Sequence, residues 1–471
     1  MSGRLALALA TARPLALTGL PDDVQATVAG TTRARGLVGA LGLPVDALAE
    51  AAAEGAVGGA WITAAGGAAA ELVVAARAYA EAGRPLAVMV LAGRPGVEAA
   101  AAQAFLRAHG AAVFTDPDAW LEALVLLAIH RAPNGHRVAL VAGADGFVAA
   151  AARTLGPDDG RRPAMTERAE PVAPTDAVLV ERAAWTVEAS ELAVLRVPLC
   201  ERAELLPEAP RGALVGLRPA LAALTTVGRA VERTRTGLGP ASRTARAELE
   251  VDEARLERQL GKRGPGDRRL GDHETKVLLS AYGVPITRQA VATSPSAAMR
   301  VATKAGFPVD VKPWGPDVGA EADGCPVEAG LTSAADVRRA FAAVLSRADL
   351  PIEGSAVIVR ASPPAGREVR VRVTTLPALG PTVVVEVAGQ PPEAAPAPLR
   401  LVDANALAAT VVATRAGDAE LDRVGLANLL RRASHLAVDH SDSVAELSLG
   451  RVIVAGRGGE TVVVDAEARL R

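Results

Sequence analysis

The chain has 471 residues, enough for about three domains of ordinary size, and half of its residues are hydrophobic while only 2% are aromatic. Its formal net charge of −2 mixes both signs, which excludes a basic surface for nucleic acid or for an anionic membrane. No apolar run reaches the roughly 20 residues that span a bilayer, and two cysteines are too few for a disulfide framework. These features predict a globular, cytoplasmic protein with aliphatic cores.

Residues 1–130 alternate short apolar strands with alanine-rich helices. Strands are predicted at 13–20, 58–66 and 85–94, and a helix is predicted at 68–84. Strands that are separated by helical patterns favour a parallel sheet with helices on both faces. The first part of the chain is therefore predicted to be an α/β unit.

A second unit of the same kind is predicted at 131–228. It opens at 135–156, where a strand runs through a glycine-containing turn into a helix, and further strands follow at 176–184 and 191–199. A helix is predicted at 219–232. The charged, Gly/Pro-containing stretch 229–268 is predicted to be a polar linker, with one helix at 247–260.

The segment from 268 to 312 reads as helix, turn, strand, helix and strand. Its last strand, PVDVK, is predicted to end at Lys312, and all four lysines of the chain lie between 262 and 312. A lysine at a sheet edge can bind nucleotide phosphates, although it can also merely solvate the strand end. Alternating segments at 381–389 and 459–470 then predict an α+β region with a largely antiparallel sheet.

These motifs resemble the ATP-grasp domain of NDP-forming acyl-CoA synthetases, the superfamily of acetate:CoA ligase and succinyl-CoA synthetase. Residues 274–285 match its pattern E-x-K-x-L-L-x-x-Y-G-[IV]-P, and residues 298–312 match A-x-x-x-A-x-x-x-G-[FY]-P-V followed by a strand lysine. A weaker resemblance covers 83–94, 102–128 and 135–156. It implies two flavodoxin-like, succinyl-CoA synthetase-type domains at 1–130 and 131–228, the linker 229–268, and an ATP-grasp domain at 269–471. The family's N-terminal CoA-binding domain is expected to be missing.

The phosphohistidine loop of that family has no counterpart in this sequence. The family carries S-H-T-G after a strand ending in Gly-Arg, because a neutral imidazole can hold a phosphoryl group covalently. Here Gly93 and Arg94 are followed directly by a predicted helix, and the nearest histidine, His109, is predicted to cap that helix. No catalytic residue is therefore assigned.

The phosphate-binding loop after the strand lysine also departs from the family. Its His-Lys pair is replaced by Ala320 and Glu321, and its double glycine is replaced by Cys325 and Pro326. A carboxylate repels phosphate, and proline lacks the N–H that a glycine offers to an anion. The predicted loop is poorly suited to an anion.

A Mg²⁺ site is doubtful for the same kind of reason. The family strand E-[LI]-D-[IV]-N-P-L supplies oxygen ligands, but this chain has Ser448 for the aspartate and Gly450 for the asparagine, and Arg451 adds a positive charge. Glu368 matches the strand G-x-E-[VL]-x-[IV]-G, and Asp465 matches the terminal v-D-A-R strand. The resemblance therefore implies a nucleotide site made of Lys312, Glu368 and Asp465, with no metal ligands assigned.

Three functional readings are compatible with this pattern. The favoured one is a catalytically impaired ATP-grasp protein that binds ATP or ADP and acts as a binding or regulatory subunit for a paralogous synthetase. The second is an active, ADP-forming acid–CoA ligase completed by a partner chain with the CoA-binding domain and the histidine loop. The third is a structural or regulatory protein that binds neither nucleotide nor CoA. Neither nucleic acid nor a membrane is an expected partner.

Overall fold

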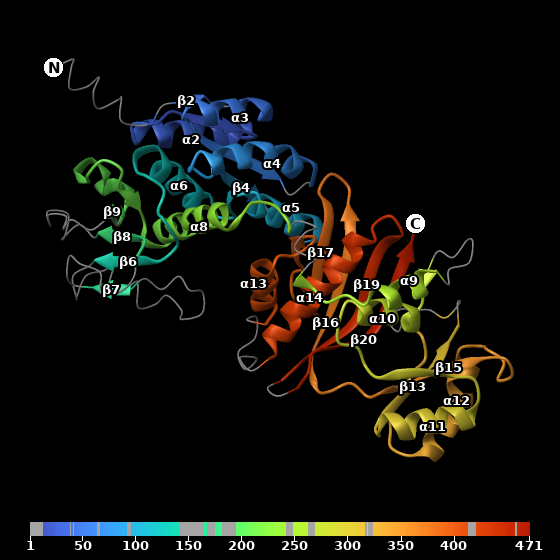
Figure 1. Ribbon diagram of the computed structural model, residues 1–471. Coiled ribbons are helices and arrows are strands. Elements are labelled where there is room, and N and C mark those ends of the chain that lie inside the picture. Colours follow the sequence, from blue (N-terminus) through green and yellow to red (C-terminus); the bar gives the residue numbers. More distant parts are fainter. Residues whose placement is uncertain are drawn as a thin grey trace, which may run out of the picture. The chain divides into compact units, whose positions relative to one another are not determined.

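The computed structural model describes residues 13–37, 39–40, 42–63, 66–91, 96–141, 164–166, 175–180, 195–241, 248–261, 269–315, 318, 324–412, 421–456 and 459–471. Two compact units make up the chain (Figure 1). Unit 1 contains residues 1–94 and 102–239, and unit 2 contains residues 95–101 and 240–471.

Unit 1 begins with a five-stranded sheet in the order β2-β1-β3-β4-β5, in which every pairing is parallel. The alternation of strands and helices in the sequence predicted this arrangement. The elements are β1 (Leu15–Thr18), α2 (Asp22–Ala34), β2 (Gly39–Ala40), α3 (Val45–Ala53), β3 (Val57–Thr63), α4 (Gly66–Glu81), β4 (Ala87–Leu91), α5 (Val97–Ala108), β5 (Ala112–Phe114) and α6 (Pro117–Ile129). The start of α5, residues 97–101, is assigned to unit 2.

A second parallel sheet follows in unit 1, in the order β10-β9-β8-β6-β7. Much of the predicted turn and helix at 135–156 lies outside the described residues, as do 181–194. The last helix, α8, extends from Leu217 to Thr236 rather than over 219–232, so the predicted boundary at 228 falls inside a helix. The other elements are β6 (Val138–Val141), β7 (Ala164–Thr166), β8 (Ala177–Val180), β9 (Leu195–Cys200), the 3₁₀ helix η3 (Ala203–Glu208) and β10 (Leu214–Val215).

The interior of unit 1 is mostly aliphatic, with Trp61 and Trp120 also buried, and an ion pair lies among its described residues. Arg35, just after α2, donates to both carboxylate oxygens of Glu122 on α6, at 3.1 and 2.9 Å, and to the Ala213 carbonyl at 2.7 Å. The backbone N–H of Val215 in β10 donates to Glu122 at 2.9 Å. This pair therefore ties the helices of the first sheet to an edge strand of the second.

Unit 2 contains a six-stranded antiparallel sheet in the order β11-β20-β19-β16-β17-β18. Helices α13 and α14 cover one face of this sheet (Figure 1), and apolar side chains on that face pack against them. The elements are α9 (Glu253–Leu260), β11 (Arg269–Leu270), α10 (Asp272–Ala281), β16 (Gly366–Leu376), β17 (Gly380–Glu386), β18 (Glu393–Pro396), α13 (Leu401–Val412), α14 (Arg423–Asp439), β19 (Val444–Ala455) and β20 (Val462–Leu470). Within the predicted linker, α8 ends and α9 forms.

A four-stranded antiparallel sheet, β12-β15-β13-β14, completes unit 2. Its helices start at serine N-caps, because Ser294 accepts from the N–H of Ala297 and Ser333 accepts from the N–H of Asp336, both at 3.2 Å. The elements are β12 (Gln289–Ala292), α11 (Pro295–Ala305), β13 (Val309–Trp314), β14 (Glu328–Leu331), α12 (Ala334–Arg347) and β15 (Ala356–Ala361). Among the described residues, no helix has the length and apolar character needed to cross a membrane.

Candidate functional site

Lys312 lies inside a strand, which corrects the prediction that the strand ends there. β13 continues to Trp314, and Lys312 is in register with Ile358 of β15. Pro313 signals a strand end because it lacks an N–H. The ladder to β14 does stop at Val311, but pairing with β15 continues past the proline. The lysine side chain therefore starts from the buried middle of the sheet.

The ammonium group of Lys312 bridges two carboxylates. Its Nζ lies 2.7 Å from Asp465 Oδ1 on β20 and 3.1 Å from Asp272 Oδ2 in the first turn of α10. Asp272 is itself fixed, because its Oδ1 accepts the N–H of Ala466 at 3.0 Å. The side chain of Lys312 is only 5% exposed and that of Asp465 only 2%. Lys312 and Asp465, predicted from separate motifs, are in direct contact.

A second buried lysine, Lys276, lies beside this pair. It comes from α10, where its Nζ is 3.1 Å from Asp272 Oδ1 and donates to the carbonyl of Val464 at 2.6 Å. It also donates to Thr287 Oγ1 at 3.2 Å and to Gln289 Oε1 at 2.8 Å. Lys276 therefore connects α10, β12 and β20.

Arg360 on β15 completes the arrangement. Its guanidinium pairs with Asp310 at 3.2 Å and donates to the carbonyl of Val464 at 2.8 Å, and its side chain is 1% exposed. Asp310 accepts additional bonds from Ser362 Oγ at 2.6 Å and from the N–H of Gly330 at 3.0 Å. These residues join the four-stranded sheet to β20 of the six-stranded sheet. We call the set the charged seam: Asp272, Lys276, Asp310, Lys312, Arg360 and Asp465.

The seam balances its charges, with three cations facing three carboxylates. Burial lowers the pKa of Lys276 to about 8, against the opposing effect of Asp272. Burial alone raises the pKa of Asp272, but Lys276 and Lys312 outweigh it, so the pKa of this carboxyl is lowered. Buried charges are tolerated when they are paired and hydrogen-bonded, as they are here. The arrangement can hold two sheets together, and it presents lysine close to any ligand that displaces a carboxylate.

Glu368 is separate from the seam. It lies on β16 with a half-exposed side chain, and Arg451 Nε donates to its Oε2 at 3.0 Å. Arg451 is in register with Asp465, so one arginine stands between the two predicted carboxylates. The structure thus brings together Lys312 and Asp465 and leaves Glu368 in a surface ion pair.

Sequence reasoning missed most of the seam. Lys276 lies within a motif of the resemblance but is not a predicted site residue, and neither are Asp272, Asp310 and Arg360. One signal was available, because lysine is rare in this chain and two of its four lysines lie in the seam. An arginine inside an apolar strand, as at Arg360, was another.

Residues 262–470 match the model of the ATP-grasp domain family. This part of the chain is an ATP-grasp domain. The chain is 26% identical over 216 residues to the β subunit of ADP-forming acetate–CoA ligase II of Pyrococcus furiosus, covering 42% of this chain and 91% of that subunit. It is 25% identical over 215 residues to ADP-forming 4-hydroxybutyrate–CoA ligase of Nitrosopumilus maritimus, covering 43% of this chain but only 31% of that ligase.

Solved structures give a similar coverage. A structure of dinucleotide-forming acetyl-coenzyme A synthetase 1 from Candidatus Korarchaeum cryptofilum, in complex with coenzyme A and Ca-AMPCP, is 26% identical, with a TM-score of 0.40. The match covers 46% of this chain and 99% of that one.

At the two described positions of β19 where the resemblance implies ligands for Mg²⁺, the side chains offer few oxygen atoms. At the positions where the resemblance implies an aspartate and an asparagine, Ser448 offers one hydroxyl and Gly450 offers no side chain. Among the described residues, no group of three or more His, Cys, Asp or Glu side chains could hold a metal. Of the phosphate loop, Cys325 and Pro326 are described, while 320 and 321 lie outside the described residues.

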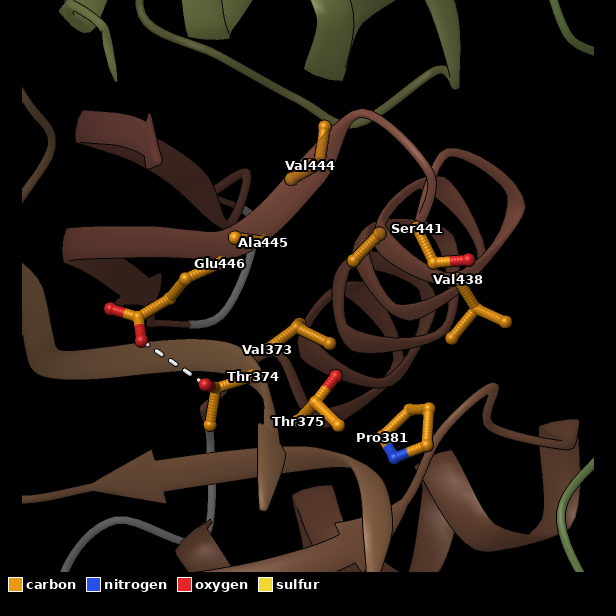
Figure 2. Close-up of a pocket in the computed structure, with 10 residues that line it drawn as sticks. Val373, Thr374, Thr375, Pro381, Val438, Ser441, Val444, Ala445 and Glu446 are labelled. Atoms are coloured by element: carbon orange, nitrogen blue, oxygen red, sulfur yellow. Dashed lines mark hydrogen bonds between the residues drawn. The ribbon is translucent and has the colours of Figure 1, made fainter. Parts of the chain in front are cut away.

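A small cavity of about 20 Å³ lies elsewhere in the ATP-grasp domain (Figure 2). It lies where β16, β17 and β19 meet the end of α14, and its lining includes Thr375, Pro381, Val438 and Ser441. At its edge Thr374 Oγ1 donates to Glu446 at 3.1 Å, the contact drawn in Figure 2. This volume suits a water molecule and is far too small for a nucleotide.

Proposed function

We propose that this chain is an ATP-grasp protein of the NDP-forming acyl-CoA synthetase type that binds ATP or ADP, is catalytically impaired on its own, and acts as a binding or regulatory subunit. The observation that carries the proposal is the strand β19. It belongs to an ATP-grasp domain, yet it has Ser448 and Gly450 where ligands for Mg²⁺ are implied. Without Mg²⁺ the charge that develops on a transferred phosphoryl group is not neutralised. The proposal therefore retains binding and omits phosphoryl transfer.

In this proposal the nucleotide contacts Lys312, with Asp465 and Glu368 nearby. Lys312 Nζ is 2.7 Å from Asp465 and 3.1 Å from Asp272, so a phosphate oxygen reaches it by replacing one of these carboxylates. Such an exchange keeps the lysine paired with an anion. It requires the two sheets to separate slightly at the seam, and we therefore expect nucleotide binding to be coupled to local opening.

We propose further that the two parallel sheets of unit 1 are flavodoxin-like units, the second one extended to the end of α8. Support comes from the strand order, which in each sheet is 2-1-3-4-5 when its strands are numbered along the chain. An experimental structure with an antiparallel pair in either sheet would contradict this assignment.

Thermal unfolding with ligands tests the binding part of the proposal. ADP and ATP should raise the melting temperature of the full chain, because a ligand that binds only the folded state stabilises it by mass action. Adding Mg²⁺ should change the shift little. Adenosine, which lacks phosphates, is the matched control and should give a much smaller shift. Absence of any shift at millimolar ATP and ADP would refute nucleotide binding.

A turnover assay tests the impairment. The chain is incubated with ATP, Mg²⁺, acetate and CoA, and both acetyl-CoA and acid-labile phosphoprotein are measured. Neither should form, because the segment between Arg94 and Phe105 contains no histidine, and His109 lies at the end of α5, with Nδ1 2.8 Å from the carbonyl of Phe105. Label on a histidine would overturn this part of the proposal.

One observation favours the second candidate, an active ligase completed by a partner. The relative from Pyrococcus furiosus, of which 91% is covered, is named as a subunit, and its activity therefore belongs to an assembly. If the partner supplies the CoA-binding domain and the histidine, mixing the chain with such a subunit should generate acyl-CoA from ATP. Turnover that appears only in the mixture would favour this candidate over the impaired subunit.

A further inference from the structure

Arg372 lies on the face of β16 that points away from α13 and α14. Val371 and Val373 belong to the apolar core that packs on those helices, so the alternation of a strand places Arg372 on the opposite face. The register sets it directly across from Ser448 on β19. Ser448 in turn lies between the core residues Leu447 and Leu449, and it therefore shares the face of Arg372.

Within the described residues, the Nε atom of Arg372 differs from three other arginines on this face, which form ion pairs with carboxylates. Arg451 pairs with Glu368, Arg469 with Glu446, and Arg269 with Glu467. Arg372 Nε, by contrast, is buried from water and donates to no acceptor in the part of the chain that the structure describes. A desolvated N–H of a cation without an acceptor is costly, and buried polar groups are ordinarily satisfied. An anionic ligand beside Ser448 would supply such an acceptor.

We propose that Arg372 binds a phosphate oxygen of the nucleotide and takes over the place of Mg²⁺ in this ATP-grasp domain. The proposal rests on the proposed nucleotide binding. The family strand pattern G-x-E-[VL]-x-[IV]-G ends in glycine where this chain has Arg372, and the facing position has Ser448 in place of aspartate. The two residues that differ from the family patterns, Arg372 and Ser448, are therefore neighbours on adjacent strands.

Charge explains why the two departures belong together. A divalent ion held by one carboxylate presents a single net positive charge, and so does a guanidinium beside a neutral hydroxyl. The planar fork of arginine also matches phosphate, because it can donate two parallel hydrogen bonds. An aspartate at 448 would instead pair with the arginine and cancel its charge. The pair Arg372 and Ser448 thus keeps the charge that a polyphosphate needs, without a metal.

Calorimetric titration of ADP into the full chain tests the proposal. Wild type should bind ADP with a Kd that is the same, within about twofold, in EDTA and in Mg²⁺. Arg372→Gln should weaken binding about 10- to 100-fold, the size of a lost charge-assisted contact. Arg370→Gln is the matched control, because Arg370 is an exposed arginine of the same strand and is in register with Glu386 rather than Ser448. It should leave the Kd within about threefold.

Pyrophosphate in EDTA separates this proposal from the proposed function. Pyrophosphate can bind the wild type and bind Arg372→Gln more weakly, while ADP binds the wild type no more tightly than pyrophosphate does. This outcome supports the phosphate contact of Arg372 and refutes recognition of the nucleotide. If ADP binds wild type and Arg372→Gln equally well, or binds only with Mg²⁺, the role of Arg372 is overturned while nucleotide binding stands. If neither ligand binds wild type, both proposals fall. Circular dichroism of each variant confirms that the fold is retained.

Discussion

The two units bury charge in different ways. Among the described residues of unit 1, the parallel sheets share an apolar interior, and the ion pair of Arg35 with Glu122 lies at the junction of the two sheets. In the ATP-grasp domain the two sheets meet at the charged seam, where the single ammonium group of Lys312 contacts two carboxylates. Apolar packing is non-directional, whereas paired charges demand a defined geometry. The seam therefore fixes how the two sheets of the ATP-grasp domain meet, and a defect there should cost more than one in unit 1.

The largest effect is expected from Lys312→Met. This change leaves Asp272 and Asp465 buried with fewer counter-charges, and removing one partner of a buried pair typically costs about 3–5 kcal/mol. The exposed Lys304 on α11 provides the control, since Lys304→Met should change the free energy of unfolding by less than about 0.5 kcal/mol. Urea denaturation measures both. Hydrogen exchange should show the loss in β13, β20 and α10 and not in unit 1.

A wild-type-like stability of Lys312→Met would mean that the seam does not hold the sheets together. In that case the titration of ADP into the same variant becomes decisive, because it measures whether the lysine contacts the ligand. We expect the ADP affinity of Lys312→Met to fall by about one to two decades.

Glu122→Gln should produce a smaller loss, confined to unit 1. The amide keeps the shape of the side chain and can still accept from Val215, but Arg35 loses its counter-charge. We expect a cost of about 1–3 kcal/mol. Exposed Glu50 on α3 is the control, and Glu50→Gln should be neutral. Equal stability of Glu122→Gln and wild type in urea would show that the buried pair does not stabilise unit 1.

The two units should respond to alkali in opposite directions. The pKa of Lys276 is lowered from 10.5 to about 8 by burial, so between these values the unfolded chain binds more protons and the free energy of unfolding rises with pH. The pKa of Tyr79 in unit 1 is raised from 10.0 to about 12 by burial, so above pH 10 the folded chain binds more protons than the unfolded chain. The contribution of Tyr79 to the free energy of unfolding is therefore complete below pH 10 and is lost above it. Changes on the order of 1 kcal/mol per pKa unit are expected.

Variants assign these two pH effects. Urea denaturation between pH 7.5 and pH 11 measures the free energy of unfolding. In Lys276→Met this free energy should no longer rise above about pH 8. In Tyr79→Phe the free energy of unfolding should no longer fall above about pH 10. A rise that persists in Lys276→Met must come from another group, and this outcome would contradict the assignment to the seam.

The smallest effect is expected from Glu368→Gln. Its partner Arg451 is one-third exposed and Glu368 is half-exposed, and such surface pairs contribute about 0–1 kcal/mol. Arg451→Gln removes the same ion pair together with the other contacts of Arg451, so it should cost at least as much. A loss above about 2 kcal/mol for Glu368→Gln in urea would show that this pair belongs with the buried charges after all.

Much of the fold could be predicted because it depends on local patterns. Alternation of strands and helices indicated the parallel sheets, and alternating apolar residues indicated the antiparallel ones. Boundaries were less predictable, because α8 continues through a charged stretch that read as linker. In that helix the apolar residues Leu224 and Val227 are buried, whereas Arg235 is exposed, so polarity in its last turns marks a helix surface.

The candidate site was predictable only in part, because its contacts are distant in sequence. Lys312 and Asp465 were named from motifs, but they are 153 residues apart, and no local pattern states that they touch. Asp272 and Arg360 had no motif to identify them as partners. Glu368 matched its pattern equally well and lies outside the seam, which shows that a motif fixes a position on a strand and not the neighbours of its side chain.

The register that pairs Arg372 with Ser448 has a consequence for the route by which a metal site could be rebuilt. If Ser448→Asp came first, the new carboxylate would face the guanidinium across the ladder, and the resulting ion pair would occupy both groups. If Arg372→Gly came first, the strand would lose a cation and the later aspartate would remain available to a metal ion. The effect of the two substitutions therefore depends on their order. Only when Arg372→Gly comes first is the aspartate at position 448 never paired with the arginine.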